Sequence, residues 1–329
     1  MWLWSAVLPL CWALVLALRV LAWQIGLFGN SVYHRTVDAA VERWWSRRSL
    51  GLPVQHVWLI GPAGDVQENY QGLMADASLP KPLKLRESSP LRLCCPFSLS
   101  NCTSRAPELA RFLARMALKL PELKARWPTL RGVAWMGDEG SQTAFISALG
   151  KEGMVLPEAR LPLRDLADLD ALIDAFYLDC RDKDDWVLCA GVLSVESVED
   201  VDLPGEAGFL WLVSWQGRQV LHRGEYLDET HPSVTSLCAQ MQRYAAIDSA
   251  PPACLAMDKQ SQKAFVEGGW TAAKHQLAGH WGLLAHIAPF IGMSLALLHA
   301  GKAGQPCGWL SQDGNKRLAI GVAVPHDDE

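Results

Sequence analysis

The residues most capable of chemistry lie near the C-terminus, where Gly279-His280 precedes the apolar segment Ile287 to His299. A histidine at such a turn can act as a general acid or base, because the imidazole pKa lies near neutrality. Lys274 adds a second titratable group shortly before it. The same pattern also fits a polar core histidine at the start of a buried helix. The spacing indicates an active-site turn, whose chemistry depends on what the rest of the chain supplies.

The nine cysteines do not form a recognisable metal-binding or disulfide pattern. Their number is odd, their spacing is irregular, and no Cys-x-x-Cys pair occurs. A zinc site needs paired Cys or His ligands at short spacing, and disulfide frameworks belong to smaller secreted chains. The one local concentration, from Cys94-Cys95 to Cys102, has no histidine nearby. We therefore predict no metal and no cofactor.

Strands and helices alternate along the chain, as an α/β domain requires. The hydrophobic pattern predicts strands at 54–60, 130–136, 186–191, 208–214 and 219–221. It predicts helices at 105–120, 142–149, 166–178 and 233–244. Four prolines between residues 80 and 104 indicate an irregular excursion. The predicted fold class is α/β with mixed sheets.

The N-terminus is predicted to be a membrane anchor. Residues 2–18 carry no charge, and after Arg19 the segment stays apolar as far as Phe28, which approaches the roughly 20 residues that cross a bilayer. Arg19 can reach the headgroups through its long side chain. A signal peptide is the alternative, but the chain lacks a basic n-region and a small-x-small cleavage site. The basic residues gather after the span, at Arg35, Arg43, Arg47 and Arg48.

By the positive-inside rule, those arginines predict a single-pass protein whose main domain is cytoplasmic. We expect a transmembrane anchor at 1–29, a juxtamembrane helix or linker at 30–53 and the main domain at 54–329. The net charge of −5 and a pI near 6.0 give no general attraction to nucleic acid. Nucleic acid is therefore excluded as an expected partner.

Four motifs follow one another between about Ser104 and Val324. They are the hydrophobic strand Asp185–Ser194, the Gly-Glu-Ala-Gly stretch within Pro204–Gly208, the Gly279-His280 turn and the glycine turn within 311–322. In this order they resemble the thiolase and β-ketoacyl synthase superfamily. The resemblance implies a thiolase-like layered fold in two halves, about 54–200 and 201–325. The main domain is shorter than a typical ketosynthase, which implies missing loops, caps or strands.

The resemblance also indicates where catalytic residues should lie. Ketosynthases place a nucleophilic cysteine at the N-terminus of a buried helix, where the helix dipole lowers the thiol pKa. Counting back from Asp185 puts that position at Asp165, and a carboxylate there cannot carry an acyl thioester. The family's first histidine has no counterpart, and Lys274 stands one residue further from His280 than the family spacing. Asp165, Lys274 and His280 therefore describe a degenerate site with no confident catalytic residue.

Two functions remain open. The first is a catalytically inactive, membrane-anchored accessory protein that binds a protein partner. The stretch from Ala256 to Trp270, continuing to Gly314, also resembles thiolase-like proteins encoded with bacterial type VI secretion effectors. That resemblance implies the bacterial inner membrane, an effector or sister thiolase-like subunit as partner, and a homo- or heterodimer. The alternative is a divergent acyl-CoA or acyl-ACP processing enzyme, in which Asp165 and His280 face one pocket and perform acid/base catalysis.

Overall fold

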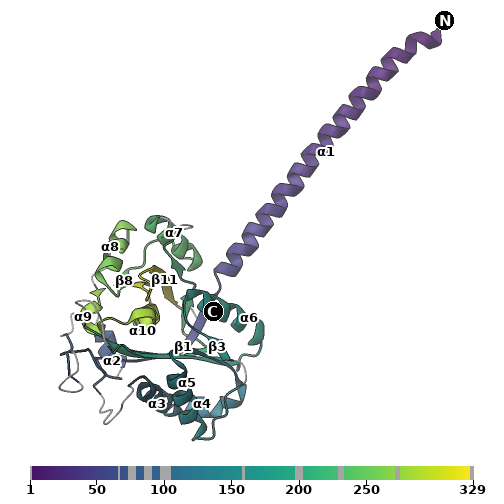
Figure 1. The fold of residues 1–329 in the computed structure, drawn as a ribbon. Coiled ribbons are helices and arrows are strands. Elements are labelled where there is room, and N and C mark those ends of the chain that lie inside the picture. The colour runs from purple at the N-terminus through teal and green to yellow at the C-terminus, as the bar shows by residue number, and fades with distance from the viewer. Residues whose placement is uncertain are drawn as a thin grey trace. The chain divides into compact units, whose positions relative to one another are not determined.

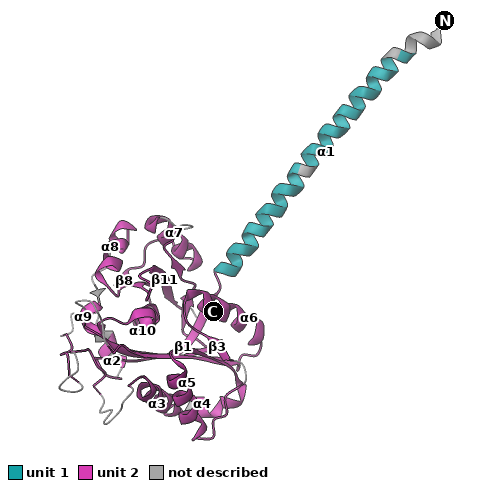
Figure 2. Ribbon diagram, viewed as in Figure 1, with its two compact units in different colours: residues 1–48 teal, residues 49–329 magenta. Residues whose placement is uncertain are grey.

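The computed structural model describes residues 2–65, 67–72, 79–84, 91–96, 105–157, 160–196, 203–228, 233–270 and 275–326. The chain divides into two compact units, Met1–Arg48 and Ser49–Glu329 (Figure 2). Each unit is described by itself.

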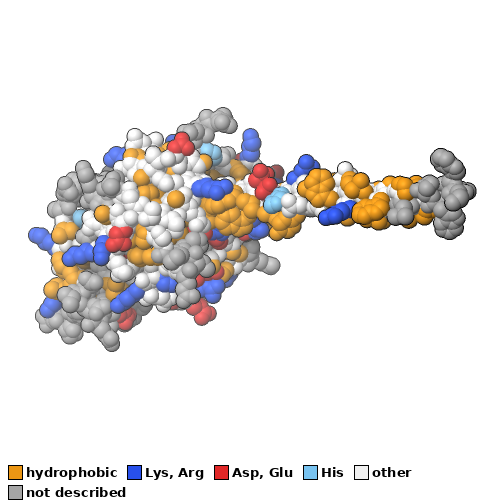
Figure 3. All heavy atoms as spheres, turned by 90° about the horizontal axis from the view of Figure 1, so that it is seen from above, with side chains coloured by type: hydrophobic (Ala, Val, Ile, Leu, Met, Phe, Trp, Pro, Cys, Tyr) orange, Lys and Arg blue, Asp and Glu red, His pale blue; other side chains and the backbone are white. Residues whose placement is uncertain are grey.

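The first unit is a single helix, α1 (Trp2–Arg48). Leucine, alanine and valine dominate its first half, and Figure 3 shows hydrophobic side chains along much of its surface. From Pro9 onward α1 is long and apolar enough to cross a membrane. The predicted anchor and juxtamembrane helix are one continuous helix, which a rise of about 1.5 Å per residue makes about 70 Å long.

The strands of the second unit are hydrogen-bonded in one continuous order, which divides into two sets. The first set comprises β1 (Gly51–Ile60), β2 (Leu130–Met136), β3 (Arg160–Pro162), β4 (Trp186–Ser194) and β5 (Glu206–Ser214). The second set comprises β6 (Gln219–His222), β8 (Ala253–Ala256), β9 (His275–Gln276), β10 (Cys307–Gln312) and β11 (Leu318–Pro325). A short strand, β7 (Glu225–Tyr226), pairs with β11.

The two sets have the same topology. The first has the order β3-β2-β4-β5-β1, and the second has the order β9-β8-β10-β11-β6. In each, the fourth strand of this order is antiparallel to both neighbours, and the other neighbouring strands are parallel. Antiparallel pairing of β1 with β6 joins the sets. The domain therefore consists of two equivalent halves with five strands each, and the change from one half to the other falls between Ser214 and Gln219.

Helices lie on both faces of the sheets. Two of them, α6 (Leu166–Asp179) and α10 (Ala288–Ala303), share a core with β1, β5, β10 and β11. On the opposite face of the first half, α3 (Arg105–Leu118) and α5 (Glu139–Gly150) pack on β2, β4 and β5. The second half carries α7 (Val234–Tyr244) and α8 (Lys259–Glu267) on its outer side (Figure 1). The layers alternate helix, sheet, helix, sheet, helix, with α6 and α10 in the middle.

Shorter helices complete the fold. They are α2 (Gln67–Gly72), α4 (Pro121–Ala125), α9 (Ala278–Trp281) and two single 3-10 turns at Trp127–Thr129 and Ala285–Ile287. The expected α/β fold with mixed sheets and a layered arrangement is confirmed. The strand predicted at 130–136 has those bounds, and the helix predicted at 166–178 ends one residue later.

Candidate functional site

Asp165 lies at the N-terminus of the central helix α6. Its backbone is extended, and one carboxylate oxygen accepts hydrogen bonds from the backbone N–H groups of Ala167 and Asp168, both at 3.0 Å. A short acceptor side chain just before an apolar periodic run is the usual start of a helix. Five side chains of α6 are buried and hold the helix in the core: Leu166, Leu169, Leu172, Ile173 and Phe176. Asp165 is thus engaged as the helix cap.

Tyr226 also lies at the start of α6. Burial raises the pKa of its phenol to about 12, while a hydrogen bond from the backbone N–H of Leu166 and the charge of Arg317 act against that rise. The Arg317 guanidinium stacks over the ring, with its central carbon 3.9 Å from the ring centre. Arg317 also pairs with Asp313 at 2.7 Å. Two backbone amides at the start of α6 therefore donate to Asp165, which belongs to the chain itself.

Arg317 belongs to the turn between β10 and β11, which lies near the starts of both central helices. Asp313 shapes this turn by accepting from the backbone N–H groups of Asn315 and Arg317 at 2.8 and 2.9 Å. A side chain added at Gly314 would come within 3.2 Å of the backbone nitrogen of His286, just before α10. Burial lowers the pKa of His286, which favours its neutral form. The turn therefore lies close to His286, just before α10.

His280 lies on the one-turn helix α9. Its neighbour Trp281 is fully buried and stacks on Tyr70, with ring centres 5.3 Å apart. Gly282 ends α9 with a φ of +68°, and a side chain there would clash with the carbonyl oxygen of Leu203. His280 itself is partly buried. Gly282 is therefore required by the backbone geometry at the end of α9, and this requirement does not depend on the role of His280.

The described hydrogen bonds of Asp165 do not involve His280. The hydrogen bonds of Asp165 are with backbone amides of α6, and its charge contributes to raising the pKa values of Tyr226 and Arg317. Lys274 lies outside the described residues. Tyr226 and Arg317 were missed by sequence reasoning, since nothing local marks a tyrosine on a two-residue strand as a neighbour of a helix about sixty residues earlier.

The Gly-Glu-Ala-Gly motif places a carboxylate in the core. Glu206 is fully buried and accepts from the Ser194 hydroxyl at 3.0 Å, the Cys95 backbone N–H at 3.2 Å and the Arg105 guanidinium at 2.7 Å. Arg92 approaches it at 3.8 Å. The carboxylate joins four separate segments, so its described role is structural.

The cysteine thiols are poorly suited to nucleophilic chemistry. Seven of the described cysteines are buried, and only Cys11 on α1 is exposed. Burial raises the pKa of Cys180, Cys238 and Cys254 to about 12, and that of Cys94 to about 11. A thiol with such a pKa holds its proton at neutral pH, and the thiolate is the reactive form. Within the described ranges, no three His, Cys, Asp or Glu side chains group as metal ligands.

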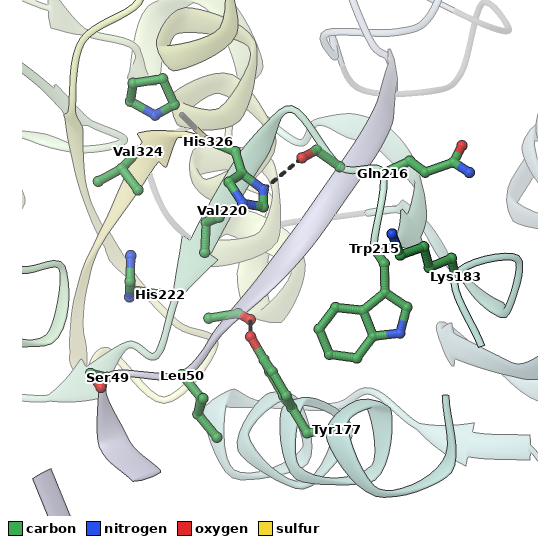
Figure 4. Close-up of a pocket in the computed structure, with 13 residues that line it drawn as sticks. Ser49, Leu50, Tyr177, Lys183, Trp215, Gln216, Val220, His222, Val324 and His326 are labelled. Carbon is green, nitrogen blue, oxygen red and sulfur yellow. Dashed lines mark hydrogen bonds between the residues drawn. The ribbon is translucent and has the colours of Figure 1, made fainter. Parts of the chain in front are cut away.

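A cavity of about 770 Å³ opens at the other end of α6. Trp215 and Tyr177 border it on one side, and Val220 and His222 lie on the opposite side (Figure 4). The Tyr177 hydroxyl donates to the Gly51 carbonyl at 2.9 Å, and the ring of His326 bonds to the Gly217 carbonyl at 2.8 Å. The cavity was not predicted, because its walls come from five separate elements.

Several solved structures are similar to this chain. The ishigamide ketosynthase/chain length factor has a TM-score of 0.55 and 14% identity, covering 84% of this chain and 99% of that one. A ketosynthase from module 6 of the bacillaene synthase of Bacillus subtilis 168 has a TM-score of 0.57 and 9% identity, covering 85% and 71%. The dimeric peroxisomal thiolase of Saccharomyces cerevisiae has a TM-score of 0.55 and 8% identity, covering 85% and 98%.

These likenesses define the fold. The protein has the fold of thiolases and ketosynthases, as the sequence motifs imply. No family model matches the chain, and no curated protein sequence matches it. At such low identity the activity of the neighbours does not carry over with the fold.

Proposed function

We propose that this protein is a catalytically inactive, membrane-anchored member of the thiolase fold that acts by binding a protein partner. The observation that carries the proposal is the start of α6. There the helix cap is Asp165, whose carboxylate accepts hydrogen bonds from the backbone N–H groups of Ala167 and Asp168.

Acyl transfer through a covalent intermediate needs a thiolate and free N–H donors for the oxyanion. Asp165 offers a carboxylate in place of a thiol, and it occupies two backbone donors itself. The described cysteines of the main domain are buried, so none supplies a substitute nucleophile. Among the described residues, the start of α6 therefore offers a carboxylate and no thiol.

Protein binding is the function that fits such a scaffold. One structural neighbour is an acyl-carrier protein in complex with its ketosynthase, and another is a dimeric thiolase. Interaction with a protein surface, in a homo- or heterodimer or with a smaller partner, needs no catalytic residue. We propose a type VI secretion effector or a sister thiolase-like subunit as the partner. This choice rests on the sequence resemblance.

Membrane anchoring is part of the same proposal. It is supported by α1, whose apolar part is long enough to cross a bilayer. The arginines that follow the apolar part favour a cytoplasmic main domain in the bacterial inner membrane. Sedimentation with membranes after carbonate extraction is the expected behaviour of the full chain, and release by carbonate would contradict anchoring.

The decisive experiment measures covalent capture. The full chain in detergent is incubated with an acyl-CoA or a cerulenin-type inhibitor, and its intact mass is recorded. We expect no adduct. Asp165→Cys serves as a comparison variant, because it places a thiol at the helix start while it removes the side-chain cap. A stoichiometric adduct on any cysteine of the unmodified chain would refute catalytic inactivity.

A further inference from the structure

One face of α1 stays apolar beyond the part of the helix that can lie in a membrane. α1 is a single helix without a break from Trp2 to Arg48 (Figure 1), and its apolar segment ends at Phe28. At a rise of about 1.5 Å per residue, Val37 and Val41 lie about 14 and 20 Å past Phe28 along the helix axis. The headgroup layer on each side of a bilayer is only about 5–8 Å thick. When α1 spans a bilayer, both valines therefore stand in water.

The two valines belong to a longer row of side chains on α1. Their side chains are 39% and 47% exposed. Apolar residues follow one another at alternating intervals of three and four positions, with Asn30 and His34 filling two positions of the same row. An average interval of 3.5 residues is the period of a coiled coil, whereas a lone helix has 3.6 residues per turn. We call this row the seam, and its apolar members are Val20, Trp23, Leu27, Val37, Val41 and Trp44.

The charged side chains next to this part of the seam lie elsewhere on the helix. The spacing places Arg35, Glu42 and Arg43 on the opposite side, where Arg43 donates to the Ala39 carbonyl at 3.2 Å. Asp38 lies on one flank of the seam, and Tyr33 lies on the other.

These two flanking residues are complementary across a pair of identical helices. In a parallel pair in register, Tyr33 of one helix faces Asp38 of the other, at the flanking positions that set partner choice in coiled coils. The phenol can then donate to the carboxylate, and symmetry makes this contact twice. The flanks thus fit a second copy of the same helix.

The continuity of the seam also indicates its partner. Trp23 and Leu27 belong to the apolar segment, whereas Val37 and Val41 lie beyond it. A soluble protein can cover only the second group, while a helix that also spans the bilayer can cover both. A second α1 in the same membrane presents its seam at the same depth and in the same direction. Small residues beside the seam allow the two backbones to approach, and they are Ala17, Gly26 and Ala40.

We propose that the seam of α1 pairs with the seam of a second copy of this chain, in a parallel coiled coil that begins in the membrane and continues to Trp44. Asn30 and His34 meet their counterparts where the pair leaves the apolar layer, and a polar residue at a seam position fixes the register. The proposal rests on the anchoring part of the proposed function and not on catalytic inactivity.

Disulfide cross-linking of the full chain in membranes tests this pairing. Cys11, the one exposed cysteine among those described, is first replaced by serine to give the baseline chain. Single cysteines are then introduced and oxidised with copper phenanthroline, and dimers are measured by non-reducing electrophoresis. We expect Val37→Cys and Val41→Cys to cross-link at least about 5-fold more than Ala39→Cys, because only the seam brings the β-carbons of two copies within about 3.5–4.5 Å.

A charge placed in the seam separates this pairing from a dimer held by the main domain. With Asn30→Cys as the reporter, Val37→Asp should lower cross-linking about 10-fold, because two like charges would face each other in the seam. Ala39→Asp adds the same charge on the opposite side of α1 and should leave cross-linking unchanged. A dimer held only by the main domain would respond equally to both variants.

Equal cross-linking at Val37→Cys, Val41→Cys and Ala39→Cys would overturn the proposal, and so would equal effects of Val37→Asp and Ala39→Asp. The absence of cross-links in a chain that carbonate does not release would overturn the pairing and leave the anchor intact. Release by carbonate would overturn the pairing together with the anchor, so the two failures are distinguishable.

Discussion

Replacing Glu206 by glutamine tests whether the buried carboxylate holds the first half together. The amide keeps the shape of the side chain but removes its negative charge. The side chains of Arg105 and Arg92 are only 10% and 7% exposed, so both guanidinium groups would remain in the core without a counter-charge. The four segments that meet at Glu206 would lose the charge that attracts them.

The expected magnitude follows from the burial of all three groups. Removing one partner of a buried ion pair costs about 3–5 kcal/mol, because the remaining charge stays desolvated. Asp168→Asn is the matched control, since it makes the same carboxylate-to-amide change in a bridge to the largely exposed Arg164. An exposed bridge contributes about 1 kcal/mol at most. Glu206→Gln should therefore destabilise the domain several times more than Asp168→Asn.

Urea unfolding of the full chain in detergent measures this difference. Tryptophan fluorescence is a suitable signal, because five tryptophans of the domain are fully buried. The free energy of unfolding falls by about 3 kcal/mol per molar urea for a domain of this kind. The urea concentration at the midpoint of unfolding should therefore be lower by about 1 M or more in Glu206→Gln. Adding Arg105→Met should recover part of the loss by removing one unpaired charge. A loss below about 1 kcal/mol for Glu206→Gln, or no recovery in the double variant, would refute the assignment of a buried ion cluster.

Three further predictions concern the remaining groups. Asp165→Ala should lower the free energy of unfolding by about 1 kcal/mol, and Asp165→Asn by much less, because asparagine also caps helices; equal losses in urea unfolding would argue against a cap. The folded pKa of His222, about 4, lies below its ordinary 6.5, so the unfolded chain binds the proton first. Stability should fall by up to about 3 kcal/mol as pH drops from 6.5 to 4, with a smaller fall in His222→Gln. Iodoacetamide at pH 7 should spare Cys180, Cys238 and Cys254 in the folded chain and modify them after denaturation, and peptide mass spectrometry would detect any early modification.

The local part of the fold could be predicted from the sequence. Apolar residues spaced along Leu166 to Leu178 mark one helix face, and Asp165 marks the cap, so this helix was placed almost to the residue. The strand 130–136 was equally clear. Both signals come from spacing within a short window, which the sequence displays directly. The order of the four motifs between about Ser104 and Val324 then indicated the thiolase-like layered fold.

Contacts between distant segments could not be predicted in this way. Arg105 and Glu206 are 101 positions apart, and nothing in the spacing of either residue points to the other. The matching strand order of the two halves was also hidden, although two halves and the strand at 219–221 were predicted, because β9 is too short to show a strand pattern. The tertiary pairing of β1 with β6 decides the layout, and with it the cavity.

Because the two halves are equivalent, the starts of the central helices α6 and α10 can be compared with each other. The two central helices share one core with strands of both halves, so their positions are fixed by packing whether or not chemistry occurs at their starts. The start of α6 carries a side-chain cap, Asp165, whereas α10 begins without one and with Pro289 in its first turn. The turn that carries Gly314 and Arg317 lies close to both. A reaction at this junction would need these donors to be free for substrate, while a scaffold needs them to be satisfied within the chain. At α6 two of these donors are taken by Asp165, which supports the proposed scaffold role.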